Sequence, residues 1–179
     1  MNKAEIRLRE LKEQDVEGML EWMHDEEIQK GFRKPMLTYT KKMAMEFIKK
    51  SKYEIKEGES IHFAITNSKD EYLGTISLKN LDLVSYSAEY AVVIRKGVQG
   101  KGYAKEATLK LLEKGFIDYG LERIYLNVLS ENEKANELYK RCGFVYEGEA
   151  RKAVAINGIF HSLKWYSMLK EEYIELFYN

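Results

Sequence analysis

The stretch that decides the fold is residues 89–116, EYAVVIRKGVQGKGYAKEATLKLLEKGF. It begins with a run of aromatic and β-branched residues, typical of a strand, and continues with apolar residues at helical spacing. Between the two, three of the chain's twelve glycines lie within six positions, at Gly97, Gly100 and Gly102. Glycine lets backbone amides approach an anion, and a helix N-terminus attracts negative charge. The glycine loop, residues 95–102, is therefore a candidate phosphate site, although an ordinary strand–helix turn would explain these residues equally well.

Two common nucleotide-binding motifs do not fit the glycine loop. A Walker A loop needs Gly-x-x-x-x-Gly-Lys-Ser/Thr, whereas Gly97 and Gly100 are three residues apart and no hydroxyl follows Lys101. A dinucleotide fingerprint needs a further glycine where residues 103–105 are Tyr-Ala-Lys. The pattern that remains, QGKGYA at 99–104, is Gln/Arg-x-x-Gly-x-Gly/Ala, which can point successive N–H groups at a pyrophosphate.

A second informative segment is SENEKANELYKRCGF at residues 130–144. Ser130 and Glu133 have the spacing of a capping box, which predicts the start of a helix. Asn132 and Tyr139 are two helical turns apart and would point the same way, along an elongated ligand. Tyr139 by itself would be interpreted as a core aromatic, since the chain has 13 tyrosines.

Composition limits the function classes. The chain has 179 residues, with 29 Lys and Arg against 29 Asp and Glu, so no net charge favours nucleic acid or an anionic membrane as a partner. A single cysteine, Cys142, excludes an internal disulfide and fits a reducing compartment. We expect no metal, because no histidine pair has ligand spacing. We also expect no membrane span, a cytoplasmic location and one domain over 1–179.

The hydrophobic periodicity predicts an α/β (α+β) fold of the order β-α-α-β-β-β-α-β-α-β-β. A central mixed, mostly antiparallel, twisted sheet would be flanked by helices. We expect strands at 4–9, 61–67, 71–81, 85–94 and 123–129, and a last hairpin around a type I′ turn at Asn157-Gly158. We expect helices at 14–24, 40–56, 103–118 and 132–141, with a loop or broken helix at 25–38.

Four segments together resemble the GNAT superfamily of acyl-CoA-dependent N-acetyltransferases: AEYAVVI (88–94), QGKGYAKEA (99–107), IYLNV (124–128) and NEKANELYKRCGF (132–144). Residues 145–169 resemble the branch with the Rim-type ribosomal-protein N-terminal acetyltransferases and the bacterial spermidine acetyltransferases. The resemblance implies a single GNAT domain that uses acetyl-CoA as co-substrate.

The resemblance also implies roles for particular residues. Tyr139 would donate a proton to the departing CoA thiolate, which suits a phenol that stays protonated at neutral pH. Asn132, with Asn127 and Asn136 as weaker candidates, would contact the pantetheine arm or the adenine end. The pantetheine arm would bind the backbone of Val92, Val93 and Ile94. The pyrophosphate would bind the segment made of Gln99, Gly100, Lys101, Gly102, Tyr103, Ala104 and Lys105.

The general base is less clearly indicated. Glu89 shares a strand face with Ala91 and Val93 and is the first candidate, although an exposed carboxylate or an ion-pair partner would have the same pattern. His24, His62 and His161 are the alternatives by chemistry. Related enzymes can also work without a dedicated base.

The acceptor would lie between residues 22–39 and 150–163. Asp25, Glu26 and Glu27 suit a cationic amine, although they also fit a solvated helix end, while Arg33 and Lys34 suit a phosphate-bearing acceptor. The leading hypothesis is acetylation of a primary amine, with a protein or peptide N-terminus first and a polyamine or amino-sugar nucleotide as the alternative. A non-catalytic acyl-CoA-binding module and a nucleotide-binding protein are the competing classes. The aromatic C-terminus (173–179) would either pack in a homodimer or close its own domain.

Overall fold

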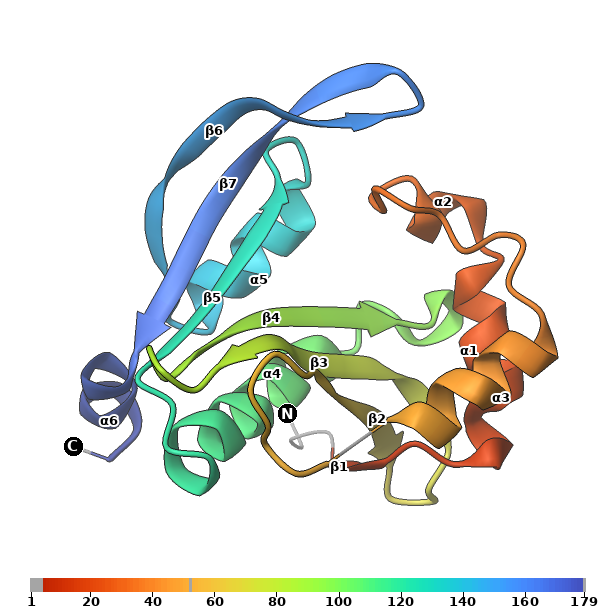
Figure 1. Ribbon diagram of the computed structural model, residues 1–179, viewed down its shortest axis with the longest axis horizontal. Helices are drawn as coiled ribbons and strands as arrows, with labels where there is room; N and C mark the ends of the chain where they lie inside the picture. The colour runs from red at the N-terminus through yellow and green to blue at the C-terminus, as the bar shows by residue number, and fades with distance from the viewer. Residues whose placement is uncertain (1–4, 52, 179) are drawn as a thin grey trace.

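The computed structural model describes residues 5–51 and 53–178 and contains one seven-stranded sheet in the order β1-β2-β3-β4-β5-β7-β6 (Figure 1). Only β4 and β5 are parallel; the other neighbouring strands are antiparallel. This confirms the expected mixed, mostly antiparallel sheet. The strands are β1 (Ile6–Glu10), β2 (Ile61–Asn67), β3 (Tyr72–Asp82), β4 (Ser87–Ile94), β5 (Arg123–Leu129), β6 (Val145–Ile156) and β7 (Ile159–Leu169).

Helices cover both faces of the sheet. The larger core lies on the side of α4 and α5, and a second core forms where α1 and α3 pack on the other side. A π-helical turn, Lys114–Asp118, continues α4. The helices are α1 (Val16–Met23), α2 (Glu26–Gln29), α3 (Lys41–Lys50), α4 (Tyr103–Glu113), α5 (Glu133–Arg141) and α6 (Lys170–Tyr178).

The second predicted helix was too long. α3 ends at Lys50, where Ser51 turns to an extended conformation and its hydroxyl donates to the Phe47 carbonyl. Within and after this helix, Met43 and Ile55 are 41% and 37% exposed, whereas Phe47 packs into the second core. Parts of the predicted first strand, second helix and C-terminal segment (residues 1–4, Lys52 and Asn179) lie outside the described residues.

The two short helices α2 and α6 were absent from the predicted order. α2 lies within the segment expected to be a loop or broken helix, and Asp25 caps it by accepting a hydrogen bond from the Ile28 amide. α6 follows β7 directly, and its Tyr173 ring lies 5.1 Å from the Phe116 ring. The C-terminal segment therefore packs on its own chain through at least one aromatic residue.

The capping box predicted at Ser130 and Glu133 does not form. Asn132 caps α5 instead, since its side-chain oxygen accepts from the Ala135 amide at 3.1 Å. The Ser130 backbone is bound to β7, where its amide donates to the Ser162 carbonyl. The helix therefore begins at Glu133, and the Ser130 hydroxyl is buried without a hydrogen-bond partner in the described parts of the chain.

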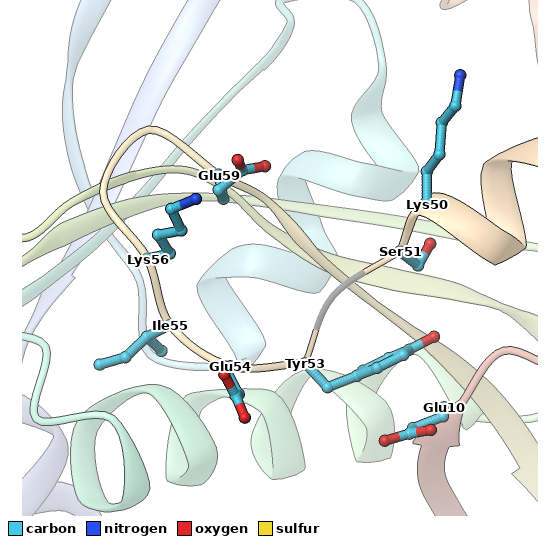
Figure 2. Close-up of a pocket in the computed structure, with 8 residues that line it drawn as sticks. All are labelled: Glu10, Lys50, Ser51, Tyr53, Glu54, Ile55, Lys56 and Glu59. Atoms are coloured by element: carbon cyan, nitrogen blue, oxygen red, sulfur yellow. The ribbon is translucent and has the colours of Figure 1, made fainter.

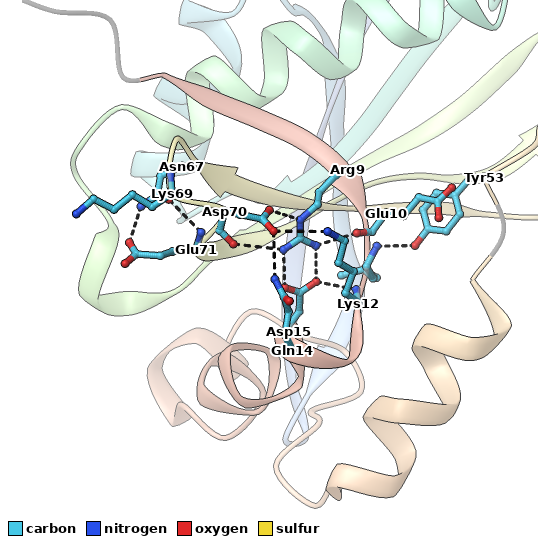
Figure 3. A network of polar contacts seen from close by, with 11 residues as sticks. Arg9, Glu10, Lys12, Gln14, Asp15, Tyr53, Asn67, Lys69, Asp70 and Glu71 are labelled. Atoms are coloured by element: carbon cyan, nitrogen blue, oxygen red, sulfur yellow. Dashed lines mark hydrogen bonds and ion pairs between the residues drawn. The ribbon is translucent and has the colours of Figure 1, made fainter.

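A partly buried ion network joins the end of β1 to the β2–β3 turn (Figure 3). The Arg9 guanidinium binds both carboxylate oxygens of Asp15, at 2.7 and 2.8 Å, and also pairs with Asp70. Asp15 is buried and its carboxylate also accepts from the Lys12 amide. These carboxylates raise the pKa of Arg9, so the guanidinium stays charged. Removing one partner of such a pair would leave a buried charge without compensation.

Gly74 of β3 allows an unusually close approach to β4. A Cβ atom at this position would lie 2.2 Å from the Val93 carbonyl oxygen, which is a backbone atom and cannot rotate away. Gly74 pairs with Ile94 in the strand register. Any larger residue would therefore push β4 away from β3.

We predict that Gly74→Ala lowers the free energy of unfolding by about 1–3 kcal/mol, because the added methyl group overpacks a backbone contact. Urea unfolding would measure the loss. Gly31→Ala is the matched control, since its nearest atom would lie 4.0 Å away, and we expect it to stay within about 0.5 kcal/mol. Equal stability of Gly74→Ala and the wild type would contradict the close contact.

Candidate functional site

The central feature of the site is the opening between β4 and β5. These strands pair at three positions, the last being Glu89 with Tyr125. Beyond that point β5 stays paired with β7 along its whole length, and Figure 1 shows β4 and β5 diverging. From Tyr90 to Ile94, the side of β4 that faces β5 has no strand partner among the described residues. An unpaired strand edge can bind an extended ligand through its backbone groups.

The glycine loop leads from the end of this edge to the N-terminus of α4. Gly100 and Gly102 have φ values of 77° and 83°, which favour glycine, and Gly102 occupies the N-cap position. Within the described chain, none of the backbone N–H groups from Gly100 to Lys105 donates a hydrogen bond; the first to do so is that of Glu106, to the Gly102 carbonyl. Unpaired amides at the N-terminus of an eleven-residue helix are suited to bind an anion.

Gln99 bonds within the chain through its side chain, and its contact with a pyrophosphate stays a prediction. Its side-chain amide donates to the Ile94 carbonyl at 2.9 Å, so it ties the glycine loop back to the end of β4. This contact positions the loop and leaves the following backbone amides, together with Lys101 and Lys105, as the groups available to an anion.

Tyr139 of α5 lies behind the opening and connects its two sides. Its ring lies 5.8 Å from that of Tyr90 on β4 and 6.2 Å from that of Tyr166 on β7. Burial raises the pKa of the phenol, so it stays protonated at neutral pH. The Tyr139 hydroxyl makes no hydrogen bond in the described chain. If it were also shielded from solvent it would be a buried group without a partner, but the Ser130 hydroxyl is the only such group among the described side chains. The Tyr139 hydroxyl must therefore reach solvent, although its residue is only 8% exposed.

A family model that describes an acetyltransferase (GNAT) domain matches residues 5–145. The chain belongs to the GNAT acetyltransferase family. The resemblance inferred from the four sequence segments is thus confirmed, and all four segments, which span residues 88–144, lie within the matched region.

Curated relatives include acetyltransferases with two kinds of acceptor. The chain is 33% identical over 112 residues to a spermidine N(1)-acetyltransferase of Vibrio cholerae, a match that covers 63% of this chain and 65% of the relative. It is 40% identical over 100 residues to the putative ribosomal N-acetyltransferase YdaF of Bacillus subtilis, covering 56% and 55%. The chain thus matches between about half and two thirds of the length of these two relatives.

A solved GNAT structure extends the likeness over nearly the whole chain. The Vibrio cholerae spermidine N-acetyltransferase, in a crystal structure with CoA and spermine, superimposes with a TM-score of 0.84 at 26% identity. The match covers 95% of this chain and 98% of that one. The predicted fold class is therefore confirmed.

The structure gives the three candidate asparagines different positions. Asn132 uses its side-chain oxygen to cap α5. Asn136 is buried, donates to the Leu129 and Asn132 carbonyls and accepts from the Tyr166 hydroxyl. Asn127 is partly buried on β5 and faces away from the α5 core. Asn136 thus holds α5 on the sheet and Asn132 caps the helix, and contact of any of the three with a ligand stays a prediction.

Glu89 lies at the apex of the opening, and its carboxylate has two partners. Lys79 donates to one oxygen at 2.8 Å and Asn80 to the other at 3.0 Å. This is the ion-pair arrangement that the strand pattern had left open. A role as general base stays a prediction, and it would require the carboxylate to accept a proton while paired with Lys79.

The three histidines lie in separate environments. His62 bonds through Nδ1 to the Ser77 hydroxyl at 2.7 Å, and burial followed by the charge of Lys79 lowers the pKa of its imidazole to about 4. His24 bonds to a backbone carbonyl, and His161 bonds through Nδ1 to the Glu131 carboxylate. His62 is thus neutral at pH 7.

The acidic segment expected at the acceptor is largely paired. Asp25 caps α2 and lies 3.4 Å from the Lys96 ammonium, and Glu27 pairs with Lys30. These contacts match the alternative of a solvated helix end. Arg33 and Lys34 are exposed beyond α2. Charge along this segment therefore does not by itself select the acceptor.

Two aromatic residues that the sequence analysis did not single out lie beside the opening. Tyr125 is the last residue of β5 that pairs with β4, and its ring stacks on Trp165 of β7 with centroids 6.3 Å apart. The alternation of side chains along β5 was sufficient to predict that Tyr125 lies on the face of this strand opposite to α5. The β5–β7 pairing was needed to bring Trp165 beside it.

A pocket of about 760 Å³ lies elsewhere, between the end of β1 and the loop after α3 (Figure 2). None of the predicted site residues lines it. Its lining residues are Glu10, Lys50, Ser51, Tyr53, Glu54, Ile55, Lys56 and Glu59. In the described chain, no helix is long and apolar enough to cross a membrane, and no group of three or more His, Cys, Asp or Glu side chains is arranged to hold a metal.

We predict that Gly102→Ala weakens acetyl-CoA binding about tenfold or more, because a side chain in the left-handed region costs about 1–2 kcal/mol and relaxation would redirect the loop amides. Isothermal titration calorimetry would measure the change.

The matched control is Gly120→Ala, since Gly120 also has a left-handed φ, of 68°, and open space around its Cβ position. We expect both variants to lose similar stability, with acetyl-CoA affinity reduced only in Gly102→Ala. Unchanged affinity in Gly102→Ala would show that the pyrophosphate does not bind this loop.

Proposed function

We propose that the protein transfers the acetyl group of acetyl-CoA to a primary amine, with a polyamine as the leading acceptor. The observation that supports this best is found in the described chain: one side of β4 from Tyr90 to Ile94 has no strand partner, the backbone N–H groups from Gly100 to Lys105 are unpaired, and the Tyr139 hydroxyl lies behind them. Family membership and the likeness to a structure that contains CoA support the same co-substrate.

The residues present fit acetyl-CoA. The backbone of Val92, Val93 and Ile94 would pair with the pantetheine arm as a neighbouring strand does. The amides from Gly100 to Lys105 and the N-terminus of α4 would bind the pyrophosphate, with Lys101 adding positive charge. An N–H of the same part of β4 would donate to the thioester carbonyl oxygen, where negative charge develops as the amine attacks.

Tyr139 would supply the proton that the departing thiolate needs. The amine nitrogen forms a bond to the acetyl carbon, the carbon–sulfur bond breaks, and the phenol proton moves to sulfur. Because burial raises its pKa, the phenol is protonated at neutral pH and is therefore in the form that can donate a proton to the departing sulfur. The proton lost by the amine would leave through Glu89 or through water.

The acceptor preference differs from the one that the sequence analysis ranked first. A protein N-terminus was the leading hypothesis, but the spermidine acetyltransferases among the relatives and solved structures favour a polyamine. A ribosomal-protein N-terminus stays the second candidate because of the 40% identity to YdaF. An amino-sugar nucleotide has no such support among these relatives.

We predict that the protein releases free thiol from acetyl-CoA fastest with spermidine, compared with Ala- or Ser-starting peptides and an amino-sugar nucleotide, because the relatives with a named small substrate act on spermidine. A thiol-reactive dye would measure the rate, and mass spectrometry would detect the acetylated product. Faster release with the peptides would replace the polyamine by a protein N-terminus. No release with any amine, despite acetyl-CoA binding, would favour a non-catalytic module.

We predict that Tyr139→Phe lowers kcat roughly a hundredfold, the contribution typical of a general acid, with little change in acetyl-CoA affinity. Since no hydrogen bond in the described chain involves the Tyr139 hydroxyl, its removal should leave the melting temperature unchanged. Tyr90→Phe provides a structural control, because the Tyr90 hydroxyl bonds to Thr108 inside the core. If Tyr139→Phe retained wild-type turnover, Tyr139 would not be the proton donor.

A further inference from the structure

The pair Tyr125 and Trp165 forms an aromatic surface on the face of the β5–β7 arm opposite to α5. The two rings are nearly parallel, with an interplanar angle of 27°, and both residues are partly buried. Tyr125 pairs in register with Glu89 at the apex of the opening. Trp165 of β7 pairs with Asn127, which is two residues after Tyr125 on β5. A substrate that enters the opening from this face would pass beside the rings.

This surface already binds one cation of the chain itself. The Arg123 guanidinium lies 5.6 Å from the centre of the Tyr125 ring and is fixed by two bonds to the Glu147 carboxylate, at 2.6 and 2.7 Å. In the described parts of the chain no cationic group lies over Trp165. The indole has the strongest attraction of the aromatic side chains for a cation.

A carboxylate lies beside the rings, together with the positive charge of Arg123, which is itself paired with Glu147. The Glu89 carboxylate lies close enough to act on Tyr125, whose pKa is raised first by burial and then by that negative charge. Lys79 and Asn80 each occupy one oxygen of Glu89, but a carboxylate can accept further hydrogen bonds. A flexible ammonium could thus meet an aromatic face and a carboxylate together.

We propose that Trp165, supported by Tyr125, forms a subsite for the distal ammonium of the polyamine acceptor. The proposal rests on the proposed function and specifies how its substrate is recognised. The amine that attacks the thioester must be neutral, whereas the other amines of the same molecule stay charged at neutral pH. An aromatic face binds such a charge without blocking its release, because each cation–π contact contributes only modestly.

The test compares spermidine with n-butylamine, which has a similar amine and alkyl chain but no second ammonium, for the wild type, Trp165→Leu and Trp165→Phe. We expect Trp165→Leu to raise KM for spermidine roughly five- to twentyfold and to leave KM for n-butylamine and acetyl-CoA unchanged. Trp165→Phe should retain most of the spermidine affinity. Tyr146→Leu is the control, since Tyr146 is 51% exposed and packs on Tyr166, on the α5 side of the same arm.

A fluorescence titration tests the subsite without changing Trp165. The chain has only two tryptophans, so in Trp22→Phe all indole emission comes from Trp165. We expect spermidine to change this emission and n-butylamine to leave it unaffected. If both amines had the same effect, or if Trp165→Leu changed both KM values equally, the subsite would be wrong. If the wild type acetylates spermidine and Trp165→Leu has the same KM for it, the subsite is rejected and the proposed function is retained. If the wild type acetylates no polyamine, both proposals are rejected.

Discussion

The parting of β4 and β5 after the Glu89–Tyr125 pair is the constraint on which the candidate site depends. β5 pairs with β7 at every one of its seven positions but with β4 at only three. Had the parallel pairing continued, the far half of β4 would be an interior strand with no backbone groups left for a ligand. The parting leaves that half without a strand partner in the described chain, shortly before the amides from Gly100 to Lys105, which are also unpaired there.

Aromatic rings connect β4 to the β5–β7 arm through α5. Tyr139 packs edge-on against Tyr90 of β4 and also contacts Tyr166 of β7, whose hydroxyl binds Asn136 of α5. Each such ring pair contributes about 0.5–1.5 kcal/mol beyond its buried area. The ring of this tyrosine therefore belongs to the core, whereas its hydroxyl makes no hydrogen bond within the described chain.

The acceptor side shows why a charge pattern along the sequence cannot identify a substrate. Asp25 was considered for its negative charge and Glu89 as a general base, yet in the folded chain each forms an ion pair, with Lys96 and Lys79 respectively. Ion pairing depends on neighbours that are distant along the chain or opposite in the sheet, so it is invisible to a composition count. The aromatic surface at Trp165 was overlooked for the same reason, since Tyr125 is 40 residues earlier in the chain.

The sequence by itself determined the strand β4, the glycine loop and helix α4, because strand propensity, glycine conformation and helical periodicity act within a few residues. It also determined the left-handed turn at Asn157-Gly158, where both residues have positive φ. Only the tertiary structure decided where α3 ends, that Asn132 replaces Ser130 as the cap of α5, and which polar groups stay unpaired. The change of cap on α5, for example, goes with a contact between distant segments, the bond from the Ser130 amide to the Ser162 carbonyl, which no local pattern contains.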